Sequence, residues 1–436
     1  MNAALAAPVE PLVADESIPD ASIPDASIPD ASIPDPAPVV PYVPVPSSIA
    51  YTYKRFPLTI VRGDGVTLFD DAGNAYLDCM SGIATNALGY NDAGVNAAIA
   101  EALSTGLIHL SNLVTNEPGE RLAHFLTART FADKVFFCNS GVEAVEGAFK
   151  FARRWARTQD AEGAKHEIVA VRGSFHGRLF ASVAATDRAA YRLPFTPLVP
   201  GISIVERDLP SLSTMLSAQT TAALIIEPVQ GEGGVRPMDH GFLRELRALT
   251  RERNILLILD EIQCGMGRTG CFLAHEPAGI KPDIVTLAKP LAGGLPIGAV
   301  LMTAEVANAL QPGEHGTTFG GGPLVTHVAQ HVCERIADPA LLLRVREDGA
   351  WFGAQLNALK DAHPSVRAVR GVGFMWGVDV TEPASAVIER ARDEGLLIIS
   401  AGDHTLRILP PLTATRADLA LAIGMLDAAL RGVKAA

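Results

Sequence analysis

Residues 255–260 read ILLILD, and residues 283–288 read DIVTLA. Both runs are apolar without alternation, which is typical of strands buried on both faces of a parallel sheet. An amphipathic stretch at residues 241–253 supplies a crossover helix before the first of them. We therefore predict a doubly wound α/β domain whose ligands bind at the carboxyl ends of its strands. Further runs of the same kind occur at residues 168–171, 202–205 and 222–227.

The chain on either side of these runs has a different pattern of apolar and polar residues. Alternating apolar and polar residues around two turns at residues 59–82 predict hairpin strands, and residues 93–103 have a helical pattern. After about residue 325, helices alternate with short strands such as GFMWGVDV and LLIIS, which predicts a smaller α+β domain. The predicted division is a tail at 1–48, an N-terminal strand segment at 49–85, a large domain at 86–324 and a small domain at 325–436.

The first 48 residues have a composition of their own. Residues 17–36 repeat the phrase SIPDA three times and end with SIPDP. The segment holds eleven of the thirty prolines and seven acidic residues, with no Lys or Arg. Such a sequence cannot bury enough apolar surface to offset its ordering entropy, so we predict a disordered tail. A partner-binding role is the alternative, and the absence of basic residues argues against a targeting signal.

Composition excludes several functional classes for the remainder. The net charge is −12, of which the tail contributes −7, so binding to a nucleic-acid backbone is not expected. No run of eighteen apolar residues occurs, so we predict no membrane span. Five cysteines without a CxxC pair and scattered histidines indicate reduced thiols, no metal site and a cytoplasmic protein.

Three short motifs carry candidate chemistry. Ser140 and Glu143 have the spacing of a capping box, and the helix that they would start could bind phosphate at its free amides near Gly141. Asp260, at the end of a buried strand, could hold a proton on a heterocyclic nitrogen or merely cap a helix. Lys289 follows an apolar strand, where burial would free a neutral amine; a structural lysine is the alternative.

A fourth group consists of arginines and threonines beside glycines. Arg178 lies in SFHGR, Arg407 in LRILPPL, and Thr317 and Thr318 in HGTTFGGG. Arginine suits bidentate binding of carboxylates, and paired hydroxyls suit phosphate. Each of these residues taken singly is more often structural.

The order and spacing of these pieces resemble the class-III aminotransferases, which are pyridoxal-phosphate (PLP) enzymes of fold type I. The resemblance covers the chain from about residue 51 to its end. Within the family, the motifs GMGRTG, AKPLAGGLPIGAV and AGDHTLRILPPL most resemble those of acetylornithine aminotransferases. The motifs that carry the family resemblance are FFCNSGVEA, GSFHGR, EPVQGEGGV, LILDEIQCGMGRTG, PDIVTLAKPLAGGLPIGAV and HGTTFGGGPL.

The resemblance implies a role for each matching residue. Lys289 would form the Schiff base with PLP and move the proton, and Asp260 would pair with the ring nitrogen. For the remaining cofactor contacts, it implies Gln263 near the phenolic oxygen, Phe175 on the ring face, and Gly141, Val142 and Thr318 at the phosphate. Thr318 would come from a neighbouring subunit, with Thr317 close to the substrate, so the resemblance implies a homodimer with shared active sites.

The implied reaction is transamination of N2-acetylornithine with 2-oxoglutarate. Arg178 would bind the carboxylate far from the reacting amine in both substrates. Arg407 would bind the near carboxylate of glutamate, and Glu232 would mask it for the other donor, because a buried unpaired guanidinium is costly. Alternatives are ornithine, 4-aminobutyrate and succinyl-diaminopimelate aminotransferases, a mutase on the same scaffold, or a non-catalytic PLP-binding relative.

Overall fold

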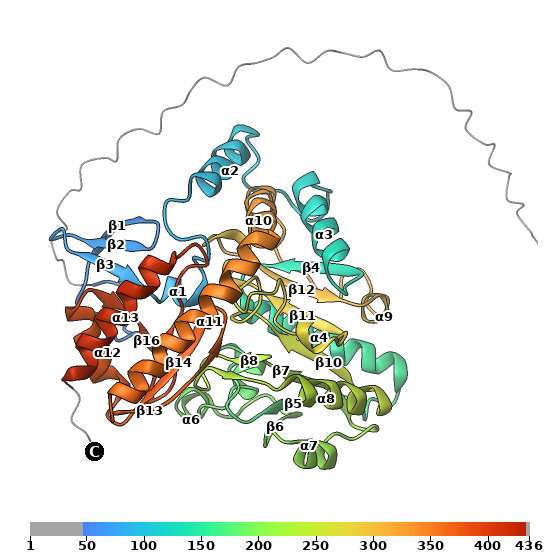
Figure 1. The fold of residues 1–436 in the computed structure, drawn as a ribbon. Coiled ribbons are helices and arrows are strands. Elements are labelled where there is room, and N and C mark those ends of the chain that lie inside the picture. Colours follow the sequence, from blue (N-terminus) through green and yellow to red (C-terminus); the bar gives the residue numbers. More distant parts are fainter. Residues whose placement is uncertain (1–46, 433–436) are drawn as a thin grey trace, which may run out of the picture. The chain divides into compact units, whose positions relative to one another are not determined.

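The five runs predicted as buried strands lie in one sheet of the computed structural model, which describes residues 47–432 (Figure 1). Two strands that were not predicted, β4 and β12, complete this seven-stranded sheet. The strand order is β4-β12-β11-β10-β7-β5-β6, and β12 runs opposite to the other strands. The mostly parallel sheet predicted for a fold-type-I transferase is therefore confirmed. Its strands are β4 (Lys134–Cys138), β5 (Glu167–Val171), β6 (Ile202–Val205), β7 (Thr221–Ile226), β10 (Leu256–Asp260), β11 (Ile284–Leu287) and β12 (Gly298–Met302).

Both faces of this sheet are covered, which explains the absence of alternation in its strands. Leu257 and Leu259 belong to one apolar cluster together with residues of α8 (His240–Glu252). Leu256 and Ile258 point the other way, into a second cluster with the buried face of α4 (Gly141–Gln159). Because successive side chains of a strand point to opposite faces, both sets must be apolar.

A four-stranded antiparallel sheet is formed by C-terminal residues, in the order β13-β14-β17-β16. The strands are β13 (Val366–Val372), β14 (Met375–Val380), β16 (Ile399–Ser400) and β17 (Thr405–Ile408). Three helices contact these strands or one another: α11 (Pro339–Ala362), α12 (Ala384–Asp393) and α13 (Arg416–Arg431).

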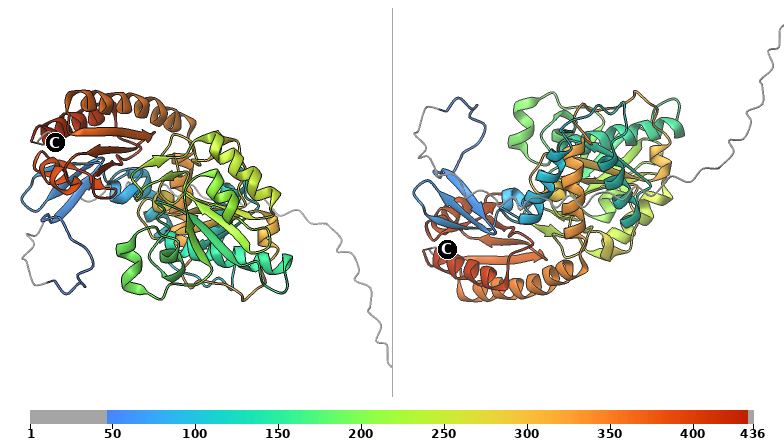
Figure 2. Two further views of the ribbon diagram at one scale, coloured as in Figure 1. Left: turned by 90° about the horizontal axis from the view of Figure 1, so that it is seen from below. Right: turned by 90° about the horizontal axis from the view of Figure 1, so that it is seen from above.

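The predicted N-terminal hairpins join a segment from the far end of the chain. β1 (Ile60–Asp64), β2 (Thr67–Asp70) and β3 (Ala75–Asp78) form a meander, and β15 (Leu396–Leu397) pairs with β3 in parallel. Figure 2 shows these blue strands beside red C-terminal elements. The prediction of one strand at LLIIS was wrong, because the run divides at Ile398 between two sheets.

The remaining helices include the predicted one at residues 93–103, which is α2 (Ala93–Ser104) with Asp92 as its N-cap. α1 (Ser81–Ala84) is a left-handed turn, since all four of its residues have a positive φ. The carboxylate of Asp78 accepts hydrogen bonds from Met80 N and Ser81 N and supports this strained turn. The other elements are α3 (Glu117–Arg129), α5 (Phe180–Ala184), α6 (Ala189–Arg192), α7 (Leu209–Met215), α9 (Ala304–Ala307), α10 (Pro323–Ile336), β8 (Val229–Gln230), β9 (Arg236–Pro237) and three 3₁₀ turns, Leu193–Phe195, Glu276–Ala278 and Lys289–Ala292.

The residues from Ser47 onward group into one compact unit. The boundaries at 85/86 and 324/325 within it stay a prediction. The predicted disordered tail lies almost wholly outside the described residues. No helix among residues 47–432 is both long enough and apolar enough to cross a membrane.

One ion pair links a crossover helix to the central sheet. Arg247 of α8 donates to both oxygens of Asp283, at 2.6 and 2.7 Å, and Asp283 Oδ2 also accepts from Leu257 N at 2.7 Å. The side chains are only 9% and 15% exposed. We expect Asp283→Ala to lower the free energy of unfolding by about 3 kcal/mol, because it leaves a buried guanidinium unpaired.

Urea unfolding followed by circular dichroism measures this change. The matched control is Glu206→Ala, which removes an ion pair to Arg172 whose side chains are both 57% exposed. That control should cost less than about 1 kcal/mol. Equal losses in the two variants would contradict the role assigned to Asp283.

Candidate active site

A cavity of about 370 Å³ lies at the carboxyl ends of β4, β5, β10 and β11. The loops that follow these strands carry most of its lining. This is the sheet edge at which the strand pattern predicts ligand binding. Seven of the predicted site residues line it: Gly141, Val142, Phe175, Arg178, Asp260, Gln263 and Lys289.

Asp260 is held rigidly at the end of β10. Its Oδ2 lies 2.8 Å from His176 Nδ1, and its Oδ1 accepts from Ile262 N at 3.1 Å and from Thr286 Oγ1 at 3.3 Å. The residue is only 4% exposed. A buried carboxylate with these partners has a fixed orientation, which suits a group that must hold a proton on a ligand nitrogen. Asp260 is not the N-cap of any helix among residues 47–432, which is the structural role that its position alone suggested.

Lys289 lies directly after β11, at the start of a 3₁₀ turn. Its φ of +25° is in the region that residues other than glycine rarely adopt, and such strain is common at functional sites. Burial lowers the pKa of Lys289, and the positive charge of Arg407 lowers it further. A larger fraction of the amine is therefore neutral near pH 7, as a nucleophile requires.

The start of α4 differs in one detail from the predicted capping box. Ser140 Oγ accepts from Glu143 N at 3.3 Å, as predicted. The Glu143 carboxylate, however, accepts from Asn139 N at 2.7 Å and from Asn139 Nδ2. A capping box would have this carboxylate accept from Ser140 N, so that part of the prediction was wrong. The carboxylate thus lies beside Asn139, before the helix begins. The first-turn amides of Gly141 and Val142 have no acceptor within the helix. These amides can bind a phosphate group.

Glycines allow the loops around the cavity to approach one another closely. Gly177 has φ +128°, and a Cβ there would lie 2.4 Å from Val142 Cγ2. A Cβ on Gly231 would lie 2.4 Å from Gln263 Oε1. Because these positions lack a Cβ, the loop after β5 can lie against the start of α4, and the loop after β8 against the loop after β10.

The two predicted carboxylate-binding arginines are in different states. Arg407, which is 2% exposed, donates to Glu232 Oε1 at 2.7 Å and to Gln263 Oε1 at 3.1 Å. Arg178 is exposed, and no carboxylate of the described residues lies within 4.0 Å of its side-chain nitrogens. Its guanidinium lies instead over the ring of Tyr191, 3.6 Å from the centroid. One arginine is masked and the other is open.

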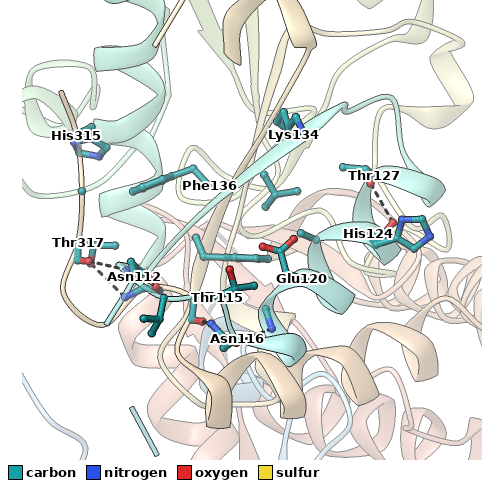
Figure 3. Close-up of a pocket in the computed structure, with 18 of the residues that line it drawn as sticks. Asn112, Thr115, Asn116, Glu120, His124, Thr127, Lys134, Phe136, His315 and Thr317 are labelled. Carbon is teal, nitrogen blue, oxygen red and sulfur yellow. Dashed lines mark hydrogen bonds between the residues drawn. The ribbon is translucent and has the colours of Figure 1, made fainter. Parts of the chain in front are cut away.

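Thr317 and Thr318 are not in the lining of the Lys289 cavity. Thr317 borders a larger cavity of about 710 Å³, where Asn112 Nδ2 donates to its carbonyl at 3.0 Å (Figure 3). Figure 3 shows side chains of α3, such as Glu120 and His124, across this cavity. Thr317 still contacts the first site, because its Oγ1 accepts from Asn139 Nδ2 at 3.0 Å. Thr318 is exposed.

Three residues of this site were missed by sequence reasoning. His176 orients Asp260, Glu227 lines the cavity, and Tyr191 stacks on Arg178. A signal was available for two of them: His176 and Glu227 follow β5 and β7, and so lie at the same sheet edge as Asp260. Tyr191 comes from a segment with no strand signal, and nothing in the sequence pointed to it.

The residues around the cavity fit PLP. A phosphate needs backbone amides free of side chains, and the first turn of α4 offers them at Gly141. A pyridine nitrogen needs a fixed buried acid, which is Asp260, and an aldehyde needs an amine that loses its proton readily, which Lys289 supplies because burial lowers its pKa. All three lie around one cavity. Within residues 47–432, no group of three or more His, Cys, Asp or Glu is placed to hold a metal ion.

Comparison with known proteins decides the family. The family model for class-III aminotransferases matches residues 48–430. The chain belongs to the class-III aminotransferases. The predictions of a PLP-dependent aminotransferase and of its fold type are therefore confirmed.

Individual relatives agree with this family. The acetylornithine aminotransferase of Gloeobacter violaceus is 46% identical over 380 residues, which cover 86% of this chain and 94% of the relative. The N-acetylornithine aminotransferase structure from Stenotrophomonas maltophilia is 35% identical with a TM-score of 0.77, covering 87% and 96%. The ornithine aminotransferase from Toxoplasma gondii is 30% identical with a TM-score of 0.85, covering 88% and 92%.

Glu227 adds a titratable group to this cavity. Its oxygens accept from Phe175 N and Gly231 N, each at 3.0 Å, yet burial outweighs these bonds and raises the pKa of Glu227 to about 7. Between pH 4.5 and 7 the folded protein then holds a proton that the unfolded chain has lost. The stability contributed by this proton is fully present below pH 4.5 and is lost as pH rises to 7.

We expect Glu227→Gln to remove this pH dependence, because glutamine does not titrate. The free energy of unfolding of the variant relative to the unmodified protein should be constant below about pH 4.5, and rise in favour of the variant from about pH 4.5 to 7. Urea unfolding at several pH values measures the difference. A flat difference from pH 4 to 8 would contradict the raised pKa.

Proposed function

We propose that the enzyme transaminates N2-acetylornithine with 2-oxoglutarate, giving N-acetylglutamate 5-semialdehyde and glutamate. The observation that carries this proposal is a contrast between two arginines. Arg178 is open and lines the cavity with Lys289 and Asp260, whereas Arg407 is masked by Glu232 and contacts Gln263 of that lining. The relatives named above support the same donor. Ornithine is the second candidate donor, supported by the Toxoplasma gondii structure.

Bound PLP supplies an aldehyde that combines with amines and a ring that accepts electrons from the adjacent carbon. Lys289 would hold the cofactor and carry a proton to and from the reacting carbon of the substrate. Asp260, oriented by His176, would hold the proton on the ring nitrogen. Phe175 would lie on the ring face, Gln263 near the phenolic oxygen, and the amides at Gly141 and Val142 on the phosphate.

The two arginines allow two different substrates to use one site. Acetylornithine carries one carboxylate, far from its reacting amine, and Arg178 would bind it. Glutamate carries a second carboxylate beside its amine, and Arg407 would bind this one after Glu232 moves away. With acetylornithine bound, Glu232 stays on Arg407, so that the buried guanidinium is not left without a carboxylate partner.

We propose further that the enzyme is a homodimer in which Thr318 completes the phosphate site of the neighbouring subunit, with Thr317 near the substrate. Thr318 is exposed and outside the Lys289 cavity, so within one chain it contributes nothing to that site. Large apolar side chains near it are also exposed: Ile108 63%, Leu113 94%, Val114 54% and Phe319 65%. A second copy covering this surface would explain both features.

We place the enzyme in the cytoplasm, with small-molecule substrates as its partners. All five cysteines are free, and four of them are buried. Free thiols are typical of a reducing compartment.

The donor is tested by half-reactions of the purified enzyme carrying PLP. We expect acetylornithine to change the cofactor absorption much faster than ornithine or 4-aminobutyrate, and 2-oxoglutarate to reverse the change. Lys289→Ala should slow the change by about 10³-fold or more, because it loses the proton carrier. Faster reaction with ornithine would favour the second candidate, and reversal without any 2-oxo acid would indicate a mutase. Lack of any change in the unmodified enzyme would contradict the transaminase function.

The masking role of Glu232 gives a separate prediction. We expect Glu232→Ala to raise kcat/KM for glutamate relative to that for acetylornithine by about tenfold, because Arg407 is then open to the near carboxylate. The ratio of the two half-reaction rates measures this. Glu206→Ala, at an exposed ion pair outside the cavity, is the control and should leave the ratio unchanged. An unchanged ratio in Glu232→Ala would remove the masking hypothesis.

A further inference from the structure

A short segment, residues 188–191, contacts both Arg178 and the backbone of Glu232. We propose that this segment positions both arginine systems, with Tyr191 holding Arg178 and Arg188 holding the Glu232–Arg407 pair. This inference rests on the proposed function, since it assigns the substrate carboxylates to these arginines. Neither residue was a candidate from the sequence.

Tyr191 acts on the open arginine. The guanidinium carbon of Arg178 lies 3.6 Å from the centroid of the Tyr191 ring, and 6.0 Å from that of Phe175. The rings of Phe175 and Tyr191 meet edge to face, with centroids 6.2 Å apart. An exposed arginine otherwise samples many rotamers, and ordering it on binding costs free energy. Stacking on Tyr191 orders the guanidinium in advance, while its N–H groups stay available to a carboxylate.

Arg188 acts on the masked arginine, through the backbone of Glu232. Arg188 Nη2 donates to the carbonyl oxygen of Glu232 at 2.7 Å. Two residues further, Arg370 Nε donates to the carbonyl oxygen of Gly234 at 2.6 Å. The loop is therefore held at two backbone positions, and the Glu232 side chain is the part left to move. Opening Arg407 then requires a side-chain rotation rather than movement of the loop.

Both contacts come from a single turn. Arg188 immediately precedes α6, and Tyr191 N donates to Arg188 O at 3.0 Å. Displacing this turn would disturb both arginine systems. Replacing the two side chains one at a time separates the two effects, because Tyr191 contacts Arg178 and Arg188 contacts the backbone of Glu232.

The first test replaces Tyr191. We expect Tyr191→Leu to raise KM for both acetylornithine and 2-oxoglutarate by about tenfold with little change in kcat, because both use Arg178. Tyr191→Phe keeps the aromatic face and should restore both values. Pentylamine, which has no carboxylate, should react equally with all forms of the enzyme. Phe69→Leu is the control, since it removes a similar stack on Arg62, 3.7 Å from the centroid, in the N-terminal sheet away from the cavity.

The second test replaces Arg188. We expect Arg188→Ala to raise the ratio of kcat/KM for glutamate to that for acetylornithine by about threefold, with pentylamine unaffected. Arg188→Lys keeps a donor and should restore most of the original ratio. The effect should be smaller than that of Glu232→Ala, because the masking carboxylate is still present.

Two results would overturn the proposal. One is an equal loss by Tyr191→Leu for pentylamine and for the carboxylate substrates, which would indicate a merely structural residue. The other is an unchanged glutamate to acetylornithine ratio in Arg188→Ala. Failure of the proposed function is distinct, because it is seen in the unmodified enzyme as lack of reaction with acetylornithine. In that case glutamate and 2-oxoglutarate, compared with pentylamine, still test Tyr191.

Discussion

The buried hydrogen bond between His176 and Asp260 is the interaction on which the site depends. It joins the loop after β5 to the end of β10, two strands separated in the sheet by β7. The bond fixes the orientation of the Asp260 carboxylate. The strand β11, which pairs with β10, fixes the position of Lys289 just after its end. Acid and amine therefore face one cavity because of the order of the strands, and the loops add the remaining contacts.

A second constraint is that one cavity has to accept substrates with one or two carboxylates. A fixed second arginine would be left unpaired by the substrate that lacks the near carboxylate, and in a buried place that is costly. In the proposed function an internal carboxylate solves this, since Glu232, which pairs with Arg407 at 2.7 Å, would replace the missing substrate group. The solution works only if the loop that carries Glu232 stays in place. Arg188 and Arg370 supply that restraint.

Much of this architecture could be predicted from the sequence, for physical reasons. Strands buried on both faces must be apolar throughout, so ILLILD and DIVTLA were readable as β10 and β11, and the site follows from where they end. Contacts between distant loops leave no such pattern. The return of Glu143 to Asn139, the division of the chain at Ile398 and the stack of Arg178 on Tyr191 depend on neighbours far away in the sequence. Glu227 was missed because a single acid after a strand does not reveal its burial.

The strained backbone of Lys289 also depends on residues that lie around it in the fold. A residue with φ +25° persists only where its surroundings determine the backbone more strongly than its own preference does. Pro290 follows, and the turn that Lys289 begins packs against α10, so neighbouring residues restrain the backbone there. The side chain is then aimed into the cavity in advance, and burial there makes its amine easier to deprotonate. The fold thus sets both the orientation of the Lys289 side chain and the lowered pKa of its amine. In the proposed function, residues of the loops would determine which substrate binds.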